Sequence, residues 1–179
     1  MRAPVCHNAP LDPAGRRIVR RHSRVDRAFA ILAFVLLSCT IAVAQTRQEH
    51  VHGMAHAVMP FDMTKTVHVF TMTESGGIER VIVKDKGDGD QVMLIRQHLR
   101  KEAARFEKGD YSDPASLHGA SMPGLRELQA GVKRVAVSYS DVPDGGQITF
   151  STTDLHLLTA IHRWFGAQLS EHGADARAD

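Results

Sequence analysis

Cysteine is almost missing from this sequence of 179 residues, which contains only Cys6 and Cys39. Both lie before Ala44, where we expect the chain to be cut. The residues after Ala44 therefore cannot form a disulfide, a thiolate metal site or a cysteine nucleophile. Their fold must be stabilised by packing alone, even in an oxidising compartment.

A large excess of one charge is also absent. The formal net charge is +2, and it is unevenly divided. Residues 1–44 contain seven arginines and two aspartates, so their net charge is 7 − 2 = +5. The remaining residues have 22 − 7 = 15 basic and 20 − 2 = 18 acidic side chains, so their net charge is −3. A mildly acidic domain lacks the basic surface of nucleic-acid-binding proteins, so we expect no nucleic-acid partner.

Residues 28–44, AFAILAFVLLSCTIAVA, form one uncharged apolar run behind an arginine-rich stretch. This order is typical of a signal sequence, and the small residues Ala42 and Ala44 predict cleavage after Ala44. We therefore expect residues 1–44 to be a signal sequence and the protein to be periplasmic or secreted. Two alternatives stay open: lipidation at Cys39, or an uncleaved segment 28–44 that anchors the chain in the inner membrane.

Residues 45–64 have no sustained apolar period and predict an extended arm, followed by a domain over 65–176. Within this domain, Val67–Thr73 and Ile78–Lys84 read as a hairpin closed by a Gly-Gly turn. Val92, Ile95, Leu99, Ala103 and Phe106 then recur at helical spacing. Residues 109–131 form an irregular connector with a short helix after Pro123.

The same order returns in the C-terminal half. Val132–Ser140 and Gln147–Thr152 read as strands around a second Gly-Gly turn, and Asp154 caps a helix that Gly173 ends. Residues 65–108 and 132–173 therefore form a ββα pseudo-repeat, with a frayed tail after it. The predicted fold class is α+β: a four-stranded antiparallel sheet with two helices on one face.

Motifs of catalysis are not found. The sequence has no Gly-x-Ser-x-Gly, no glycine-rich phosphate loop before a helix and no His-Glu-x-x-His. We therefore predict no catalytic and no organic cofactor-binding residues. An enzyme would need a concave pocket with converging polar groups, and the connector 109–131 is where we expect it.

Histidine and methionine are the abundant residues whose side chains can bind a metal ion. In an extended arm, side chains at alternate positions point to one side, so residues 50, 52, 54 and 56 would converge. Imidazole and thioether without thiolate suit copper. We expect a site for copper or another transition metal, completed from the first strand; its residues are His50, His52, Met54, His56, Met59, Met63, His68 and Met72. The alternative is that these residues are incidental composition and no cofactor is bound.

The other histidines give weaker indications of a functional site. His98 and His162 flank the apolar helical stripes and are expected to be hydrogen-bonded histidines at the edge of the core. His118 and Met122 lie in the connector, in His-Gly-Ala-Ser-Met-Pro-Gly, which is either a site or a turn.

Three stretches carry a resemblance: MPFDMTKTVHVF, GDYSDPASLHGASMPGL and AIHRWFGAQLSEHGADA. They resemble a family of small exported proteobacterial proteins of unassigned function, whose members often bear the label aspartate carbamoyltransferase. The resemblance covers about His52 to Ala176 and implies an envelope location. Of that enzyme's phosphate-binding motifs, the nearest approach to Ser-x-Arg-Thr is Ser151-Thr152-Thr153-Asp154, and His-Pro does not occur.

The leading hypothesis is a periplasmic, non-catalytic binding protein that acquires a transition metal through the arm. One alternative is an envelope interaction module that binds a protein partner through an exposed sheet face or the Trp164–Phe165 region. Another is a transferase, as the family label suggests.

Cleavage after Ala44 is directly testable. The exported protein should have a mass corresponding to residues 45–179, with Gln45 as its N-terminus. Intact-mass spectrometry and N-terminal sequencing measure this. A diacylated N-terminus at Cys39, or a full-length chain in the membrane fraction, would instead support one of the two anchored alternatives.

Overall fold

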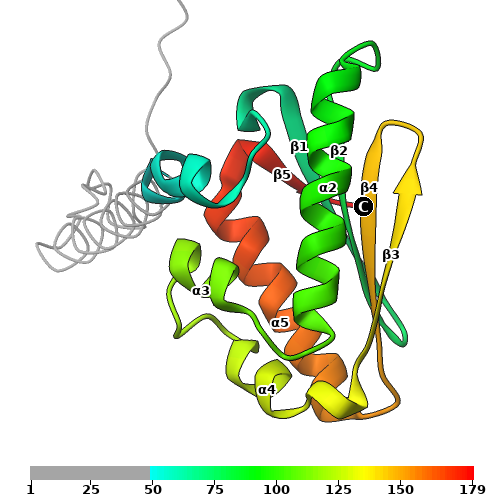
Figure 1. Cartoon of the computed structure of the whole chain (residues 1–179). Coiled ribbons are helices and arrows are strands. Elements are labelled where there is room, and N and C mark those ends of the chain that lie inside the picture. The colour runs from blue at the N-terminus through cyan, green and yellow to red at the C-terminus, as the bar shows by residue number, and fades with distance from the viewer. Residues whose placement is uncertain (1–48) are drawn as a thin grey trace, which may run out of the picture. The chain divides into compact units, whose positions relative to one another are not determined.

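The computed structural model describes residues 49–179 (Figure 1). The predicted signal sequence 1–44 lies outside the described residues, as do residues 45–48. The elements that build the fold are the strands and the longer helices; in chain order they are β1 (Thr66–Thr73), β2 (Gly76–Val83), α2 (Gly89–Phe106), α3 (Ser112–His118), α4 (Leu125–Ala130), β3 (Ala136–Val142), β4 (Gly145–Ser151), α5 (Leu155–His172) and β5 (Ala176–Ala178).

The fold is α+β, with a five-stranded, mostly antiparallel sheet in the order β3-β4-β2-β1-β5. The two hairpins predicted from the sequence are present, and they join through the antiparallel pair β2–β4. The prediction of four strands was wrong by one. The expected frayed tail instead forms β5, which pairs in parallel with β1 and begins with Ala176 opposite His68.

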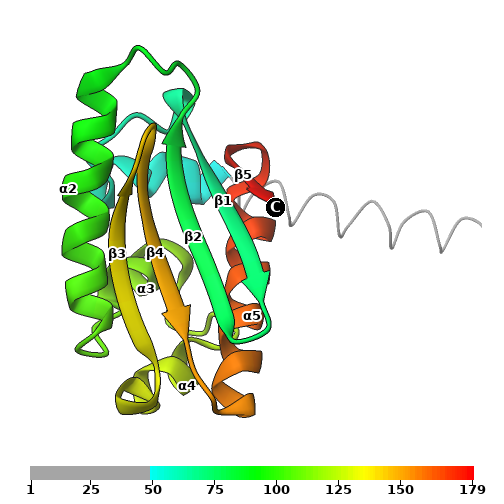
Figure 2. The same cartoon turned by 90° about the vertical axis from the view of Figure 1, so that its right-hand side faces the viewer.

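The helices cover one face of this sheet. Figure 2 shows α5 behind the strands on the right and α2 along the left-hand side of the sheet, with α3 between the two helices behind the strands. An aspartate caps each long helix: Asp88 accepts a hydrogen bond from the backbone of Gln91, and Asp154, the cap predicted from the sequence, accepts from those of His156 and Leu157. Such caps satisfy amide groups that have no partner inside the helix.

The core between the two layers is rich in aromatic rings. Trp164 is fully buried and makes edge-on contacts with Phe106, Tyr111 and Phe150. Phe165, next to it on α5, packs on Phe70 of β1 with ring centroids 5.0 Å apart. Trp164 and Phe165 are fully buried, so of the two surfaces considered for a protein partner this region presents no exposed aromatic side chain.

The connector 109–131 is more ordered than its sequence indicates. The short helix expected after Pro123 is α4, but α3 was not predicted. Gly124 has φ +84° and lies against the carbonyl of Ala160 on α5. Only glycine fits there, so α4 is held close to α5.

Residues 49–58 are helical, which corrects the prediction of an extended arm. Val51, Ala55 and Met59 recur every four residues and are all buried. This apolar stripe packs the segment onto the domain, because residues four apart lie on the same side of a helix. In the described part of the chain, no helix is long and apolar enough to cross a membrane.

The tight packing at Gly124 yields a stability prediction. Gly124→Ala should lower the free energy of unfolding by about 2 kcal/mol or more, because the new methyl group would meet the Ala160 carbonyl in a strained backbone conformation. Chemical denaturation measures the change. Gly89→Ala on α2 is the matched control, since no atom lies within 4 Å of its added carbon. Equal stability of the two variants would contradict the proposed packing.

Candidate functional site

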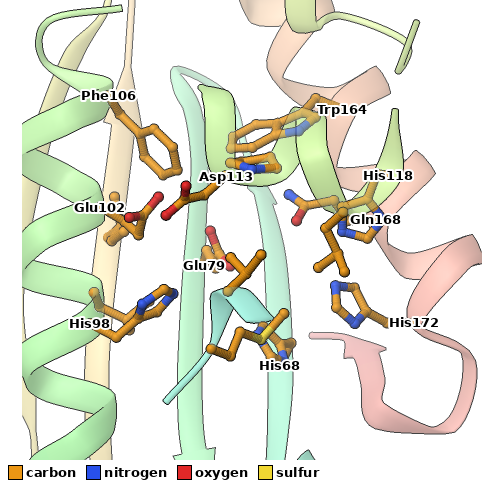
Figure 3. Close-up of a pocket in the computed structure, with 16 residues that line it drawn as sticks. His68, Glu79, His98, Glu102, Phe106, Asp113, His118, Trp164, Gln168 and His172 are labelled. Atoms are coloured by element: carbon orange, nitrogen blue, oxygen red, sulfur yellow. The ribbon is translucent and has the colours of Figure 1, made fainter. Parts of the chain in front are cut away.

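An internal cavity of about 40 Å³ lies between the sheet and the helices (Figure 3). One water molecule needs about 10–15 Å³ measured in this way, so the space suits a few small atoms. The polar side chains that line it come from β1, β2, α2, α3 and α5; they are His68, Glu79, His98, Glu102, Asp113, His118, Gln168 and His172.

The two long helices contribute matching positions of the pseudo-repeat. Counted from the capping aspartate of each helix, the residues ten, fourteen and eighteen positions later all line the cavity. They are His98, Glu102 and Phe106 on α2, and Trp164, Gln168 and His172 on α5. A spacing of four places each set on one helical face, so the pseudo-repeat explains why both sets face the same space.

The strands, unlike the helices, carry different kinds of residue at the equivalent positions of the two repeats. Glu79 of β2 pairs directly with Ile148 of β4, and these two residues hold equivalent positions in their hairpins. His68 of β1 is likewise equivalent to Val137 of β3. The first half of the chain thus places an imidazole and a carboxyl where the second half has an apolar core. Burying such groups costs free energy unless they find partners.

His68 is buried, with 3% of its surface exposed, and its Nδ1 has no hydrogen-bond partner. Its hydrogen bond to the backbone of Asp175 must therefore use Nε2. Donation from Nε2–H to a carbonyl leaves the lone pair of the neutral ring on Nδ1. Burial lowers the pKa of His68 to about 3, so the ring is neutral at ordinary pH.

His172 and His118 continue this cluster. The ring of His172 stacks on that of His68 at 4.8 Å and meets the ring of His118 edge-on at 4.9 Å. Nδ1 of His172 has no hydrogen-bond partner, and burial lowers the pKa of this histidine as well. His118 Nδ1 lies 2.9 Å from a carboxylate oxygen of Glu171, which orients the ring.

Carboxyl groups face these imidazoles across the cavity, as Figure 3 shows for Glu102 and Asp113. Burial raises the pKa of Glu79 to about 8, and the charge of Glu102 adds to the effect. Burial and the neighbouring Asp113 raise the pKa of Glu102 to about 7. At neutral pH Glu79 is therefore mostly protonated, and Glu102 exchanges its proton near this pH.

Arg105 holds the outer side of the carboxyl cluster. Its guanidinium donates to Glu102 at 3.2 Å, to Asp110 at 2.9 Å and to Asp113. The hydrogen bond from Arg105 keeps the pKa of Asp110 well below its usual range. This arginine fixes the positions of the cavity carboxyls from outside without entering the cavity.

Unsatisfied polar atoms gather at the cavity. Among the described residues, five buried side-chain nitrogens have no hydrogen-bond partner, and four of them belong to residues that line it: His68, Trp164, Gln168 and His172. Buried polar groups in proteins are nearly always paired, so these nitrogens are hydrogen-bonding groups available to a water molecule or a ligand in the cavity.

The structure separates most of the metal ligands expected from the sequence. In the helical segment, residues two apart point to nearly opposite sides, so His50 and Met54 are turned away from His52 and His56. Met54 and Met72 are exposed, Met63 is buried in the core, and His52 Nδ1 pairs with Asp175 at 3.2 Å. Only Met59 and His68 of the expected set line the cavity.

No group of three or more histidine or acidic side chains in the described range stands ready to hold a metal ion. Ring orientation explains this for His68 and His172. Their rings are nearly parallel, at 17°, so lone pairs that lie in the ring planes do not meet at one point.

The other histidine expectations had mixed outcomes. His162 is hydrogen-bonded, as predicted, with Nε2 near the carbonyl oxygens of Thr73 and Gly76. His98, expected to be a similar edge residue, instead lines the cavity, where burial lowers its pKa to about 4. His118 also lines the cavity, and it lies in the connector 109–131, where the sequence analysis expected the pocket of an enzyme. The missed signal was the spacing of His98 from Glu102, and of Gln168 from His172, at four residues each.

Comparisons with known proteins add no assignment: no family model, no curated protein and no solved structure matches this chain.

The buried carboxyl of Glu79 predicts a pH dependence of stability. Its pKa rises from 4.5 in the unfolded chain to about 8 in the folded protein, so the folded state binds this proton more tightly. That stabilisation is complete below pH 4.5 and is lost as the pH rises through 8. Glu79→Gln should remove the dependence, so the wild type should lose on the order of a few kcal/mol relative to the variant between pH 5 and 8.5.

Urea denaturation at several pH values measures this difference. Glu107→Gln at the exposed end of α2 is the control, and it should follow the wild type. If Glu79→Gln and the wild type lose stability in parallel, Glu79 does not bind its proton more tightly in the folded state.

Proposed function

We propose that this protein is an exported binding protein that holds a divalent transition-metal ion inside the cavity, with His68, His172 and Glu79 as ligands. The observation that carries the proposal is the pair of buried ring nitrogens without partners, Nδ1 of His68 and Nδ1 of His172, beside a buried carboxyl. Export rests on the sequence of residues 1–44.

The size of the cavity favours an ion over a larger ligand. About 40 Å³ accommodates a metal ion with a water molecule, but not a sugar, an amino acid or a nucleotide. The lining contains four histidines, three carboxyl groups and the thioether of Met59. These are the side chains that coordinate transition metals when cysteine is not available.

The hydrogen bonds of the histidines also favour a metal. Imidazoles that coordinate metals usually donate their second ring N–H to a carbonyl or carboxylate, which fixes the ring and directs the other nitrogen to the ion. His68 has this arrangement with the backbone of Asp175, and His118 has it with Glu171. Neutral rings are the form that binds metal, so no proton must leave His68 first.

Binding requires the rings of His68 and His172 to turn, because their lone pairs do not converge in the arrangement described above. Both rings line the cavity, and the carboxyl of Glu79 would release its proton to water when the cation binds. Copper(II) is the expected tightest binder among the divalent ions, followed by its neighbours in the series.

The transferase suggested by the family resemblance has less support. Carbamoyl phosphate is an anion, and proteins hold such phosphates with cationic side chains or helix N-termini. The described residues that line the cavity include no lysine or arginine. The volume of the cavity is also too small for two substrates.

The interaction module would use the face of the sheet that carries no helix. Val67, Ile78 and Ile82 alternate with inward residues and point to that face, where each is only partly exposed. The large hydrophobic side chains that are well exposed, Met54, Met72, Met93 and Leu155, come from separate elements. A partner on this face would leave the unpaired imidazole nitrogens of His68 and His172 unexplained, so we favour the metal ion.

The pseudo-repeat supplies variants that test the metal site. His68→Val and His172→Phe introduce the residues found at the equivalent positions, Val137 and Phe106, so both should fold. Each should weaken binding of Cu²⁺ by about 100-fold or more, because a direct ligand is lost. Competition with a chromophoric chelator measures the affinity, and thermal denaturation without metal should show no loss of stability.

The matched control changes the residues that the sequence alone favoured: His50, His52, Met54 and His56, all to Ala. This variant should retain an affinity within about threefold of the wild type. Loss of binding in this variant, together with full binding by His68→Val, would place the metal on the N-terminal segment and refute the cavity site.

A further inference from the structure

The face of the sheet that points away from the helices is uncovered in the described part of the chain. In Figure 2 this face is turned toward the viewer, and no helix of residues 49–179 crosses in front of it. Successive residues of a strand point to opposite faces. Because His68, Glu79 and Ile148 line the cavity on the helix side, their neighbours in the strands form this outer face.

The strand register arranges the outer face in four rows that run across the sheet. Each row joins residues that are paired with one another in β1, β2, β4 and β3. In that order of strands, the first row is Val67, Ile82, Gly145 and Val142; the second is Val69, Arg80, Gln147 and Ser140; the third is Thr71, Ile78, Thr149 and Ser138; the fourth is Thr73, Gly76, Ser151 and Ala136.

The outer face has little charge and is large enough for a stable contact. The only charged side chain in the four rows is Arg80, which forms an ion pair with Asp179 of the same chain. Val67, Ile78 and Ile82 are each partly exposed on this face. Five strands about 4.8 Å apart, and seven residues of about 3.4 Å each, give roughly 600 Å². Two such faces amount to about 1,200 Å², which is the lower end of stable protein interfaces.

We propose that two copies of this chain form a dimer by packing their outer faces together, around a two-fold axis that crosses the strands between the second and third rows. This axis turns the first row of one copy onto the fourth row of the other, and the second row onto the third. The strands of the two sheets then lie nearly in line, as in an aligned β-sandwich. The inference does not depend on the metal site, because no residue of the outer face lines the cavity.

The proposed axis places large side chains against small ones. Ile82 of one copy meets Gly76 of the other. In the same way, Val142 of one copy meets Ala136 of the other. No side chain fits at Gly76, because an added carbon would lie 2.0 Å from the backbone oxygen of Phe150. The space opposite Ile82 is therefore built into the backbone, and such interlocking gives the close packing of a protein interior.

The C-terminal edge is complementary in charge under the same axis. Arg177 of β5 lies level with the second row, since it pairs with Val69. Asp179 comes two residues later, level with the third row, and its backbone N–H donates to the carbonyl of Phe70. The axis thus brings Arg177 of each copy opposite Asp179 of the other. An axis along the strands would instead lay β5 over β3, which has no acidic side chain on its outer face.

The oligomeric state of the exported protein tests the dimer. In analytical ultracentrifugation at micromolar concentration, the wild type should sediment as a dimer. Ile82→Glu should raise the dissociation constant by about 100-fold or more, because it buries an unpaired carboxylate in the contact. Leu155→Glu is the matched control: Leu155 is exposed on α5, on the helix side of the sheet, and this variant should dimerise like the wild type. Thermal denaturation checks that both variants are folded.

Single cysteines test the axis, since residues 45–179 contain no other cysteine. Val67→Cys and Thr73→Cys proteins, mixed and treated with a thiol cross-linker that spans about 10 Å, should give a covalent dimer, because packed sheets lie that far apart. Neither protein alone should cross-link, because identical residues would lie six positions apart along the strands, about 20 Å.

The outcomes decide the proposal. A monomeric wild type refutes the dimer. A wild-type dimer that persists in folded Ile82→Glu, or cross-links that form equally well in the unmixed samples, refutes the packing of the outer faces around this axis. Dissociation by Ile82→Glu but not by Leu155→Glu, with cross-links only in the mixture, supports it. If Ile82→Glu does not fold, the cross-links alone decide.

Discussion

The cost of burying imidazole and carboxyl groups between two helices is the constraint on which this structure depends. The aromatic contacts of Trp164 seal one end of the space, and Arg105 fixes the carboxyl groups from the other side. The strands β1 and β2 contribute His68 and Glu79 to the cavity. Each neighbouring element thus covers the cavity or holds a polar group in place, so the unsatisfied nitrogens lie in the buried part of the space.

Much of the fold could be predicted because short segments of the sequence have patterns typical of the hairpins and helices that they form. Gly-Gly turns between β-branched runs predicted both hairpins, and Asp154 before the second apolar stripe predicted the start of α5. The strand β5 could not be predicted, since the three residues Ala176–Ala178 have no alternation of their own and pair only because β1 offers a free edge. The helix at 49–58 carried a signal, the buried spacing of Val51, Ala55 and Met59, which the more conspicuous histidines concealed.

The candidate site was predictable only in fragments. His68 was expected to be a ligand, and the connector that holds His118 was named as a place for a pocket. The other members are separated by dozens of residues along the chain, and they meet because α2 and α5 lie on the same sheet. Sequence spacing can show that His98 and Glu102 share a face, but not that this face opposes Gln168 and His172. That relation follows from the pairing of β2 with β4.

The direct pairing of Glu79 with Ile148 also bears on how such a chain could arise. Two separate copies of one ββα unit, joined by the same central strands as a symmetric dimer, would carry the same residue at both positions. Two glutamates there would face each other as like groups in the core, and two isoleucines would leave the cavity without its central carboxyl. Only after both units belong to one polypeptide can the two positions differ. If the chain arose by duplication, the difference between the polar and the apolar half of the cavity is therefore younger than the fold that contains it.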